Sequence, residues 1–163
     1  TSTIVSFSSD RTSKKHFGPY ADGFININYN DLQALEEVLS SNSNISGFLV
    51  EPIQGEAGVY VPDEGYLRKA KTLCEKYNVL FIADEIQTGI ARTGKLLAVD
   101  HENVKPDILI LGKALSGGVY PVSAVLANNH IMDVMTPGTH GSTFGGNPLG
   151  AAVAITALEI IRD

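Results

Sequence analysis

The sequence predicts an α/β domain with a mainly parallel sheet and flanking helices. Short apolar runs alternate with segments of helical periodicity, which is the usual order of elements around a parallel sheet. The apolar runs are continuous rather than alternating, as expected for strands that are covered on both faces. Polar residues follow several of these runs, at the edge where parallel sheets bind ligands.

Length and composition agree with one domain or part of one. The chain has 163 residues with a net charge of -6, so we expect no nucleic-acid partner. Cys74 is the single cysteine and excludes an internal disulfide. No apolar run approaches the ~18 residues of a membrane helix, so we expect no membrane insertion. We expect an excerpt of a longer protein, because the chain ends at Asp163 within a helical pattern.

Two helices are predicted in the first half of the chain. The first covers about residues 31–40, and Asn30 is expected to start a capping box. Asp63 is expected to cap the second helix, and Asn78 to end it. Both segments place apolar residues at helical spacing, which gives each helix one face for a core. Residues 1–28, which precede them, are expected to be irregular.

Four apolar runs are predicted strands, at residues 47–50, 79–83, 108–111 and 122–127. Glu51 and Asp84 directly follow the first two runs, and Lys113 follows the third after one glycine. Because the carboxyl ends of parallel strands meet at one edge of a sheet, we expect these three side chains to lie near one another. A last helix is predicted over about 149–162, after the glycine-rich loop 136–150.

Two nucleotide-binding motifs are rejected. Residues 89–95 have the glycine and lysine spacing of a phosphate-binding loop, but Leu96 stands where a hydroxyl would bind magnesium, and no strand leads into the segment. No strand leads into a G-x-G-x-x-G sequence either. The four histidines are far apart without ligand spacing, so we expect no metal site.

Asp84 and Lys113 together indicate a different chemistry. Alone, the first is more simply a helix cap or loop acceptor, and the second a solvated side chain. As a pair, a desolvated lysine supplies an amine for carbonyls, and a buried aspartate can hold a protonated pyridine nitrogen. Pyridoxal 5'-phosphate requires such a pair and a phosphate cup. Residues 141–146 offer hydroxyls and backbone N–H groups before a helix, which suits the phosphate.

Several segments resemble the class III pyridoxal-phosphate-dependent aminotransferases, and the likeness covers almost the whole chain. They are 50–58 (VEPIQGEAG), 81–89 (FIADEIQTG) with 91–94 (ARTG), 111–118 (LGKALSGG), 120–123 (YPVS) and 140–148 (HGSTFGGNP). Segments 111–118 and 120–123 favour members that use ornithine over relatives that use acetylornithine or 4-aminobutyrate.

This resemblance implies roles for four residues around the cofactor ring. Lys113 would bind pyridoxal 5'-phosphate covalently and then move the substrate proton. Asp84 would pair with the pyridine nitrogen, Gln87 would hydrogen-bond to the ring hydroxyl oxygen, and Ile86 would pack on one ring face.

The resemblance also implies roles for four residues around that cluster. Thr143, with the backbone near Ser142, would reach the phosphate of the neighbouring subunit's cofactor, which implies a homodimer or a larger assembly. Glu51 would support Asp84 and Gln87 without contacting the cofactor itself. Glu56 would pair with an arginine outside this chain and so let one site accept two different substrates.

As a whole, the resemblance implies a fold-type I transferase. Residues 1–163 would be the later part of its large, cofactor-binding domain, without the N-terminal part and the small C-terminal domain. The implied reaction moves the δ-amino group of ornithine to 2-oxoglutarate and gives glutamate 5-semialdehyde and glutamate, a step between arginine metabolism and proline biosynthesis. The alternatives are an acetylornithine or 4-aminobutyrate aminotransferase, or a non-catalytic fragment that retains the fold. We expect a cytoplasmic location, with the mitochondrial matrix as the alternative, and no turnover by this chain alone.

Overall fold

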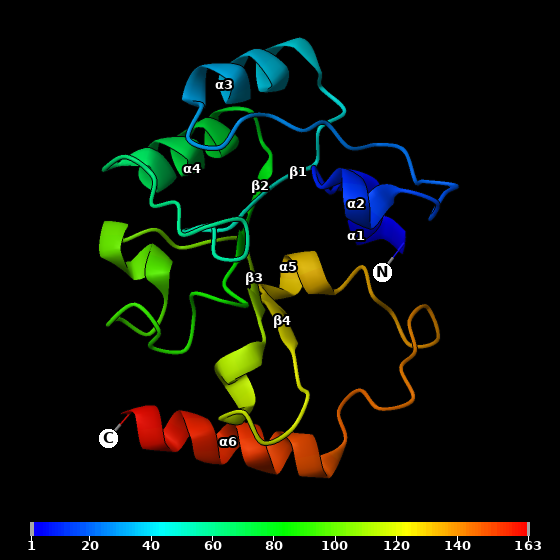
Figure 1. The fold of residues 1–163 in the computed structure, drawn as a ribbon, viewed down its shortest axis with the longest axis vertical. Coiled ribbons are helices and arrows are strands. Elements are labelled where there is room, and N and C mark those ends of the chain that lie inside the picture. Colours follow the sequence, from blue (N-terminus) through cyan, green and yellow to red (C-terminus); the bar gives the residue numbers. More distant parts are fainter. Residues whose placement is uncertain (1, 163) are drawn as a thin grey trace.

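The computed structural model describes residues 2–162, which form a four-stranded sheet with flanking helices (Figure 1). The strands lie in the order β1 (Gly47–Val50), β2 (Leu80–Asp84), β3 (Ile108–Leu111) and β4 (Ala124–Ala127). β1 pairs with β2 and β2 with β3 in parallel, whereas β4 runs antiparallel to β3. The predicted α/β class with a mainly parallel sheet is therefore confirmed.

The helices of the described residues are α1 (Ser2–Phe7), α2 (Arg11–Lys14), α3 (Leu32–Ser41), α4 (Tyr66–Lys76), α5 (Asn129–Met132) and α6 (Pro148–Arg162), with 3-10 helices η1 (Ala98–Glu102) and η2 (Lys113–Ser116). α3 packs on α4, and α4 packs on β2. At the other end of the molecule, α6 packs on η2 (Figure 1).

The main core lies where α3 and α4 cover β2. Phe81 and Ala83 of β2 are fully buried and belong to one apolar cluster with Ala70 and Cys74 of α4. Leu80, Ile82 and Asp84 alternate with them along β2, point to the opposite face and are only partly buried. The expectation that this strand is covered on both faces is thus met on one face only within the described chain.

Both predicted helix caps are wrong. Asp31, not Asn30, caps α3: its Oδ1 accepts from the Ala34 N–H at 2.9 Å. The Asn30 side chain instead accepts from the backbone N–H of Asp63 at 3.1 Å. Asp63 makes no side-chain cap, and α4 begins after Gly65, whose φ of 81° favours glycine.

The expectation that residues 1–28 are irregular is wrong in part, because α1 and α2 lie there. Asp10 caps α2, and its carboxylate accepts from the Thr12 N–H at 2.8 Å and from the Ser13 N–H at 3.3 Å. Helices of one or two turns leave almost no periodic signal in a sequence, so this local cap was the only available sign.

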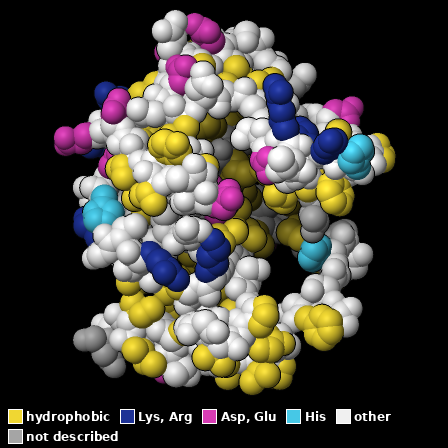
Figure 2. All heavy atoms as spheres, in the orientation of Figure 1, with side chains coloured by type: hydrophobic (Ala, Val, Ile, Leu, Met, Phe, Trp, Pro, Cys, Tyr) yellow, Lys and Arg dark blue, Asp and Glu magenta, His cyan; other side chains and the backbone are white. Residues whose placement is uncertain are grey.

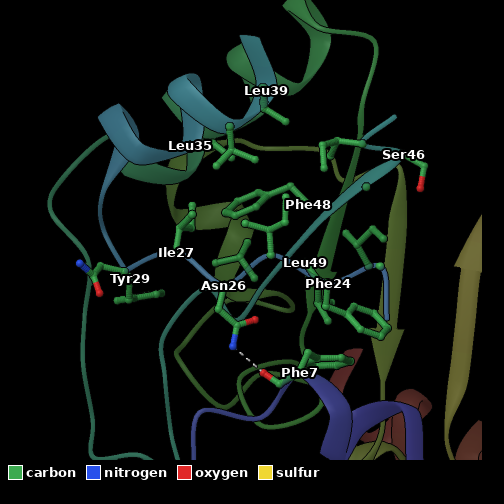
Figure 3. A pocket seen from close by; sticks show the side chains of 18 of the residues that line it. Phe7, Phe24, Asn26, Ile27, Tyr29, Leu35, Leu39, Ser46, Phe48 and Leu49 are labelled. Carbon is green, nitrogen blue, oxygen red and sulfur yellow. Dashed lines mark hydrogen bonds between the residues drawn. The ribbon is translucent and has the colours of Figure 1, made fainter. Parts of the chain in front are cut away.

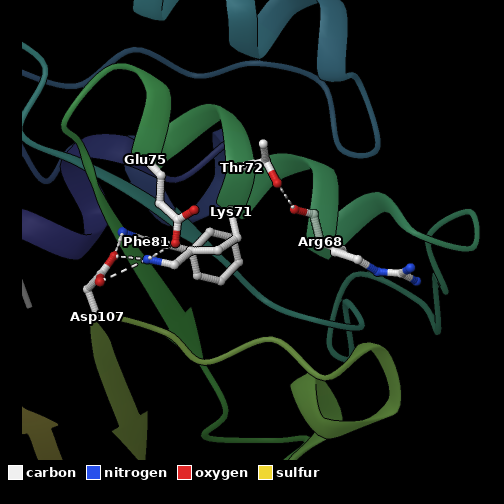
Figure 4. A network of polar contacts seen from close by, with 6 residues as sticks. All are labelled: Arg68, Lys71, Thr72, Glu75, Phe81 and Asp107. Carbon is white, nitrogen blue, oxygen red and sulfur yellow. Dashed lines mark hydrogen bonds and ion pairs between the residues drawn. The ribbon is translucent and has the colours of Figure 1, made fainter.

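A polar network fixes β2 against α4 at the amino end of the strand (Figure 4). Asp107 Oδ2 accepts from the Phe81 N–H at 2.7 Å and from Lys71 Nζ at 2.8 Å. Lys71 Nζ also lies 3.4 Å from Glu75 Oε1. Burial opposes the charge on Lys71, but the hydrogen bonds and charges of Asp107 and Glu75 outweigh it and raise the pKa of the lysine.

Two regions of the described chain expose several large apolar side chains. α6 exposes Leu149, Ile155 and Ile160, and Figure 2 shows hydrophobic side chains along this helix at the bottom of the view. β4, at one edge of the sheet, exposes Val125 and Leu126. Among residues 2–162, no helix is long and apolar enough to cross a membrane.

Candidate active site

The carboxyl end of β2 leads into a tight turn that carries three of the predicted site residues. Asp84 is the last residue of the strand and is partly buried, and its Oδ1 accepts from the Ile86 N–H at 3.0 Å. The turn closes where the Gly89 N–H donates to the Glu85 carbonyl oxygen at 2.9 Å. Asp84, Ile86 and Gln87 therefore lie within one rigid turn at the ligand-binding edge of the sheet.

Lys113 lies beside this turn, at the end of the neighbouring strand. It follows Gly112 after β3 and donates from Nζ to Gln87 Oε1. A Cβ at Gly112 would lie 3.3 Å from Ile86 Cγ2, so the strand end and the turn are in close contact. Lys113 has a φ of 42°, an uncommon conformation for a residue with a side chain and one that occurs often at functional sites.

A surface cavity of about 460 Å³ opens at this contact. Its lining combines Ile86, Gly112 and Lys113 with residues 120–123. Lys113 is exposed there, so the expectation of a desolvated lysine is wrong for this chain. No described segment covers Lys113, and Asp84 is only partly buried.

Glu51 lies beside the cluster, on the loop after β1. Its Oε2 accepts from the Gly55 N–H at 3.2 Å, and the Tyr29 hydroxyl donates to the Glu51 carbonyl oxygen at 3.2 Å. Burial raises the pKa of Tyr29, which keeps its hydroxyl a donor. A Cβ at Gly55 would lie only 2.5 Å from Gln87 Nε2, so the loop that Glu51 shapes touches the amide. Glu56 follows on the same loop and is exposed.

Ser142 and Thr143 are exposed on the loop that leads into α6. Ser142 Oγ accepts from the Gly145 N–H at 2.9 Å, and Asn147 Oδ1 accepts from the Gly150 N–H at 2.8 Å at the start of the helix. No hydrogen bond in the described chain joins either hydroxyl to Lys113. The structure thus joins Lys113 to the turn with Ile86 and Gln87, whereas the predicted phosphate cup does not line their cavity.

Sequence reasoning missed Glu85, which is fully buried although it lies between two predicted site residues. Its Oε1 accepts from the Val99 N–H at 2.9 Å, and its Oε2 accepts from Thr88 Oγ1. Alternation along an extended strand could have indicated it, because neighbours of Asp84 must point to the opposite side.

The rejected phosphate-loop motif adopts no such loop. Residues 89–95 form turns rather than the start of a helix, and Lys95 Nζ donates to the Asp100 carbonyl oxygen at 2.9 Å. The lysine thus contacts η1.

A larger cavity of about 530 Å³ lies at the open edge of β1 (Figure 3). Its lining is mainly apolar, with Phe7, Phe24, Phe48 and Leu49 among the side chains drawn. Glu51 is the only predicted site residue that lines it. We assign this cavity to packing rather than to chemistry, because its lining is mainly apolar.

Comparisons with known proteins agree with this geometry. Residues 1–163 match the family model described as Aminotransferase class-III. The chain is 62% identical to the mitochondrial ornithine aminotransferase of Drosophila melanogaster, over 100% of this chain and 38% of that protein. It is 56% identical to the ornithine aminotransferase of Toxoplasma gondii, whose structure shows partial occupancy of PLP at the active site; the TM-score is 0.98, over 100% of this chain and 38% of that one.

A third relative carries a different substrate in its name. The acetylornithine aminotransferase of Elizabethkingia anophelis is 72% identical, with a TM-score of 0.85 over 88% of this chain and 38% of that one. The chain thus spans less than half the length of the relatives that it matches. Because the family model covers every residue, the chain belongs to the class-III aminotransferase family.

Proposed function

We propose that the protein that contains this chain is a pyridoxal-phosphate-dependent ornithine aminotransferase with a 2-oxo acid as amino acceptor. One observation carries the proposal: the contact between Lys113 and the turn that holds Asp84, Ile86 and Gln87. The comparisons support it, since two of the three relatives described above are ornithine aminotransferases.

The residues present fit the cofactor in their donors and acceptors. Lys113 offers an amine at the mouth of the 460 Å³ cavity. Asp84 uses Oδ1 for the Ile86 N–H, which leaves Oδ2 for a protonated pyridine nitrogen. Gln87 accepts from Lys113 through Oε1, so its Nε2 can donate to a ring hydroxyl oxygen. Ile86 supplies an apolar surface in the same cavity for a ring face.

Pyridoxal 5'-phosphate, when bound, supplies an electron sink for the carbon that loses its proton. Residues of this chain would supply the amine, the proton transfer and the stabilising charge. Lys113 supplies the amine that binds the cofactor and then carries the substrate proton. The negative charge of Asp84 keeps the pyridine nitrogen protonated, and this preorganised charge stabilises the reacting state more than water would. Gln87 orients the lysine through the hydrogen bond at Oε1.

The charge and position of Glu56 favour ornithine over acetylornithine as the amino donor. Its carboxylate is exposed on the loop beside Gln87, where it can attract a charged α-amino group. Acetylation removes that charge, so acetylornithine gains nothing from the carboxylate. The 72% identity to an acetylornithine aminotransferase makes that enzyme the alternative function.

The test uses the full-length protein with 2-oxoglutarate and, in parallel, ornithine, N-acetylornithine and 4-aminobutyrate. We expect glutamate and glutamate 5-semialdehyde from ornithine, with a kcat/KM for ornithine well above that for the other two donors. A higher kcat/KM for N-acetylornithine would replace the proposal with the alternative. If cofactor absorbance is absent and no donor is turned over, the result would support the alternative that the chain is a non-catalytic fragment.

We also propose that residues 1–163 form the later part of the large domain in a homodimer or larger assembly. The open edges of the sheet and the apolar surface of α6 support this, because chain outside the segment can cover them. Thr143 is exposed on a glycine-rich loop, as a contact to a neighbouring subunit's cofactor phosphate requires. The proposed location is the cytoplasm, and the mitochondrial matrix is the alternative because the Drosophila relative is mitochondrial.

A further inference from the structure

Glu85 is a carboxylate in the core beside the candidate site, and the proposed chemistry does not use it. Its side chain is fully buried, as is that of Val99, and Thr88 is 5% exposed. None of the ion pairs among residues 2–162 includes Glu85. A carboxylate in such a position is retained only where its hydrogen bonds do structural or functional work.

Both oxygens of Glu85 are engaged in a way that joins two segments. Oε1 accepts from the Val99 N–H at 2.9 Å, in the first turn of η1, where backbone N–H groups lack helical partners. Oε2 accepts from the Oγ1 of Thr88, which lies three residues later in the same turn. The side chain therefore clamps the turn 84–89 onto η1.

The backbone of Glu85 is held as firmly as its side chain. Its N–H donates to the Ile110 carbonyl oxygen at 3.0 Å, and its carbonyl oxygen accepts from the Gly89 N–H at 2.9 Å. On one side of Glu85, Asp84 accepts from the Ile86 N–H; on the other side, Ile86 lines the Lys113 cavity and Gln87 contacts Lys113. One buried anchor thus lies at the centre of the turn that carries three site residues.

We propose that Glu85 is a positioning residue for the cofactor site: by hydrogen-bonding to Thr88 and Val99 it fixes the turn from which Asp84, Ile86 and Gln87 reach the cofactor. This inference rests on the proposed function and goes beyond it. Loss of the clamp frees the turn from η1, so the three side chains lose their common placement relative to Lys113.

The role depends on hydrogen bonding rather than on charge, because no cation faces the carboxylate in the ion pairs described. Glu85→Gln keeps the volume and can still accept from Val99 through its amide oxygen, while its NH₂ group donates to Thr88 Oγ1. Glu85→Leu keeps much of the volume but removes both contacts. Thr88→Val removes only the Oε2 contact with nearly unchanged shape.

The residue before β3 provides a control at the other end of β2. Asp107 also accepts from one backbone N–H, that of Phe81, and from one side chain, that of Lys71. It precedes β3 and contacts β2 near the amino end of that strand, whereas Asp84 is the last residue of β2. Asp107→Leu therefore removes a comparable clamp without touching the cofactor turn.

The experiment uses the full-length holoenzyme and its apo form. For Glu85→Leu we expect cofactor affinity, followed by absorbance, to fall by ~10-fold or more, and kcat to fall by up to ~10²-fold with little change in KM. We expect faster amide exchange over residues 85–99 in the apo protein, an effect independent of turnover. Glu85→Gln should restore affinity and kcat to within ~3-fold of the parent, and Asp107→Leu should lower stability with an unchanged cofactor spectrum.

Three results would overturn the inference. One is a folded Glu85→Leu variant with the parent's cofactor affinity and kcat. Another is an equal loss of cofactor affinity in Asp107→Leu, which would mean general destabilisation. If Glu85→Leu fails to fold, Thr88→Val decides: parental exchange over 85–99 and parental cofactor affinity in that variant would show that the Thr88 contact does not help to fix the turn, which contradicts the proposal as stated. Failure of the parent protein to bind the cofactor would contradict the proposed function instead, and the apo exchange data would still test the clamp.

Discussion

Gly55→Ala is the substitution whose effect on the site can be worked out most directly from the structure. The added Cβ would lie 2.5 Å from Gln87 Nε2, 2.6 Å from Cδ and 2.9 Å from Cγ. Ordinary contact begins near 3.4 Å, so the amide must move by 3.4 minus 2.5, or about 0.9 Å. Because the clash extends to Cγ, a rotation of the terminal amide alone does not relieve it.

The displaced amide is the group that holds Lys113, so the loss should appear in chemistry more than in folding. A misplacement of about 1 Å costs ~10²-fold in rate, which corresponds to about 2.7 kcal/mol at 1.36 kcal/mol per decade. We expect a kcat loss of ~10- to 10²-fold in the full-length enzyme, with a melting temperature that changes by only a few degrees.

The assay is steady-state kinetics with ornithine and 2-oxoglutarate, combined with the absorbance of the bound cofactor. Gly94→Ala is the control for backbone strain: nothing lies within 4 Å of a Cβ there, but its φ of 89° makes a side chain less favourable than at Gly55. A Gly55→Ala enzyme with the parent's kcat, or a Gly94→Ala enzyme with the same loss, would refute the argument that Gly55 leaves room for Gln87.

Three further predictions concern single groups. Asp84→Asn keeps the volume but removes the charge that pairs with the pyridine nitrogen, so turnover should fall by ~10² or more, and near-normal turnover would exclude this role. Glu56→Ala should leave cofactor binding intact and weaken discrimination between the two amino groups of ornithine, with less effect on the glutamate half-reaction; equal slowing of both half-reactions in single-turnover kinetics would make Glu56 structural. Burial raises the pKa of the Cys74 thiol to about 12, so alkylation at pH 8 should require unfolding. The stability that the neutral thiol contributes should be lost as pH rises above 9.0, the ordinary pKa of the thiol. Rapid labelling of the folded protein would contradict this burial.

The strands were predictable because their signals are local. A continuous apolar run such as 108–111 predicts a strand, and a polar residue at its end predicts a place at the sheet edge. Asp84 and Lys113 follow two such runs, so their place at this edge could be anticipated. Ile86 and Gln87 carry no such signal, and only the resemblance to the class III aminotransferases implied their roles.

The features that failed depend on partners far away in the sequence. Asn30 looked like a helix cap, but its side chain accepts from Asp63, 33 residues later. Glu85 was missed because its partner Val99 lies 14 residues away. Lys113 was expected to be desolvated, whereas its environment depends on what covers the cavity. No pattern within a single segment reports such contacts.

The covalent attachment of the cofactor to Lys113 tests the central claim most directly. Borohydride reduction of the full-length holoenzyme, followed by proteolysis and mass spectrometry, should place the reduced cofactor on the peptide that contains Lys113. Lys113→Ala should lose both the visible absorbance and the labelled peptide while retaining its fold. The cofactor found on Lys95, or an unlabelled Lys113 in an active enzyme, would contradict the account.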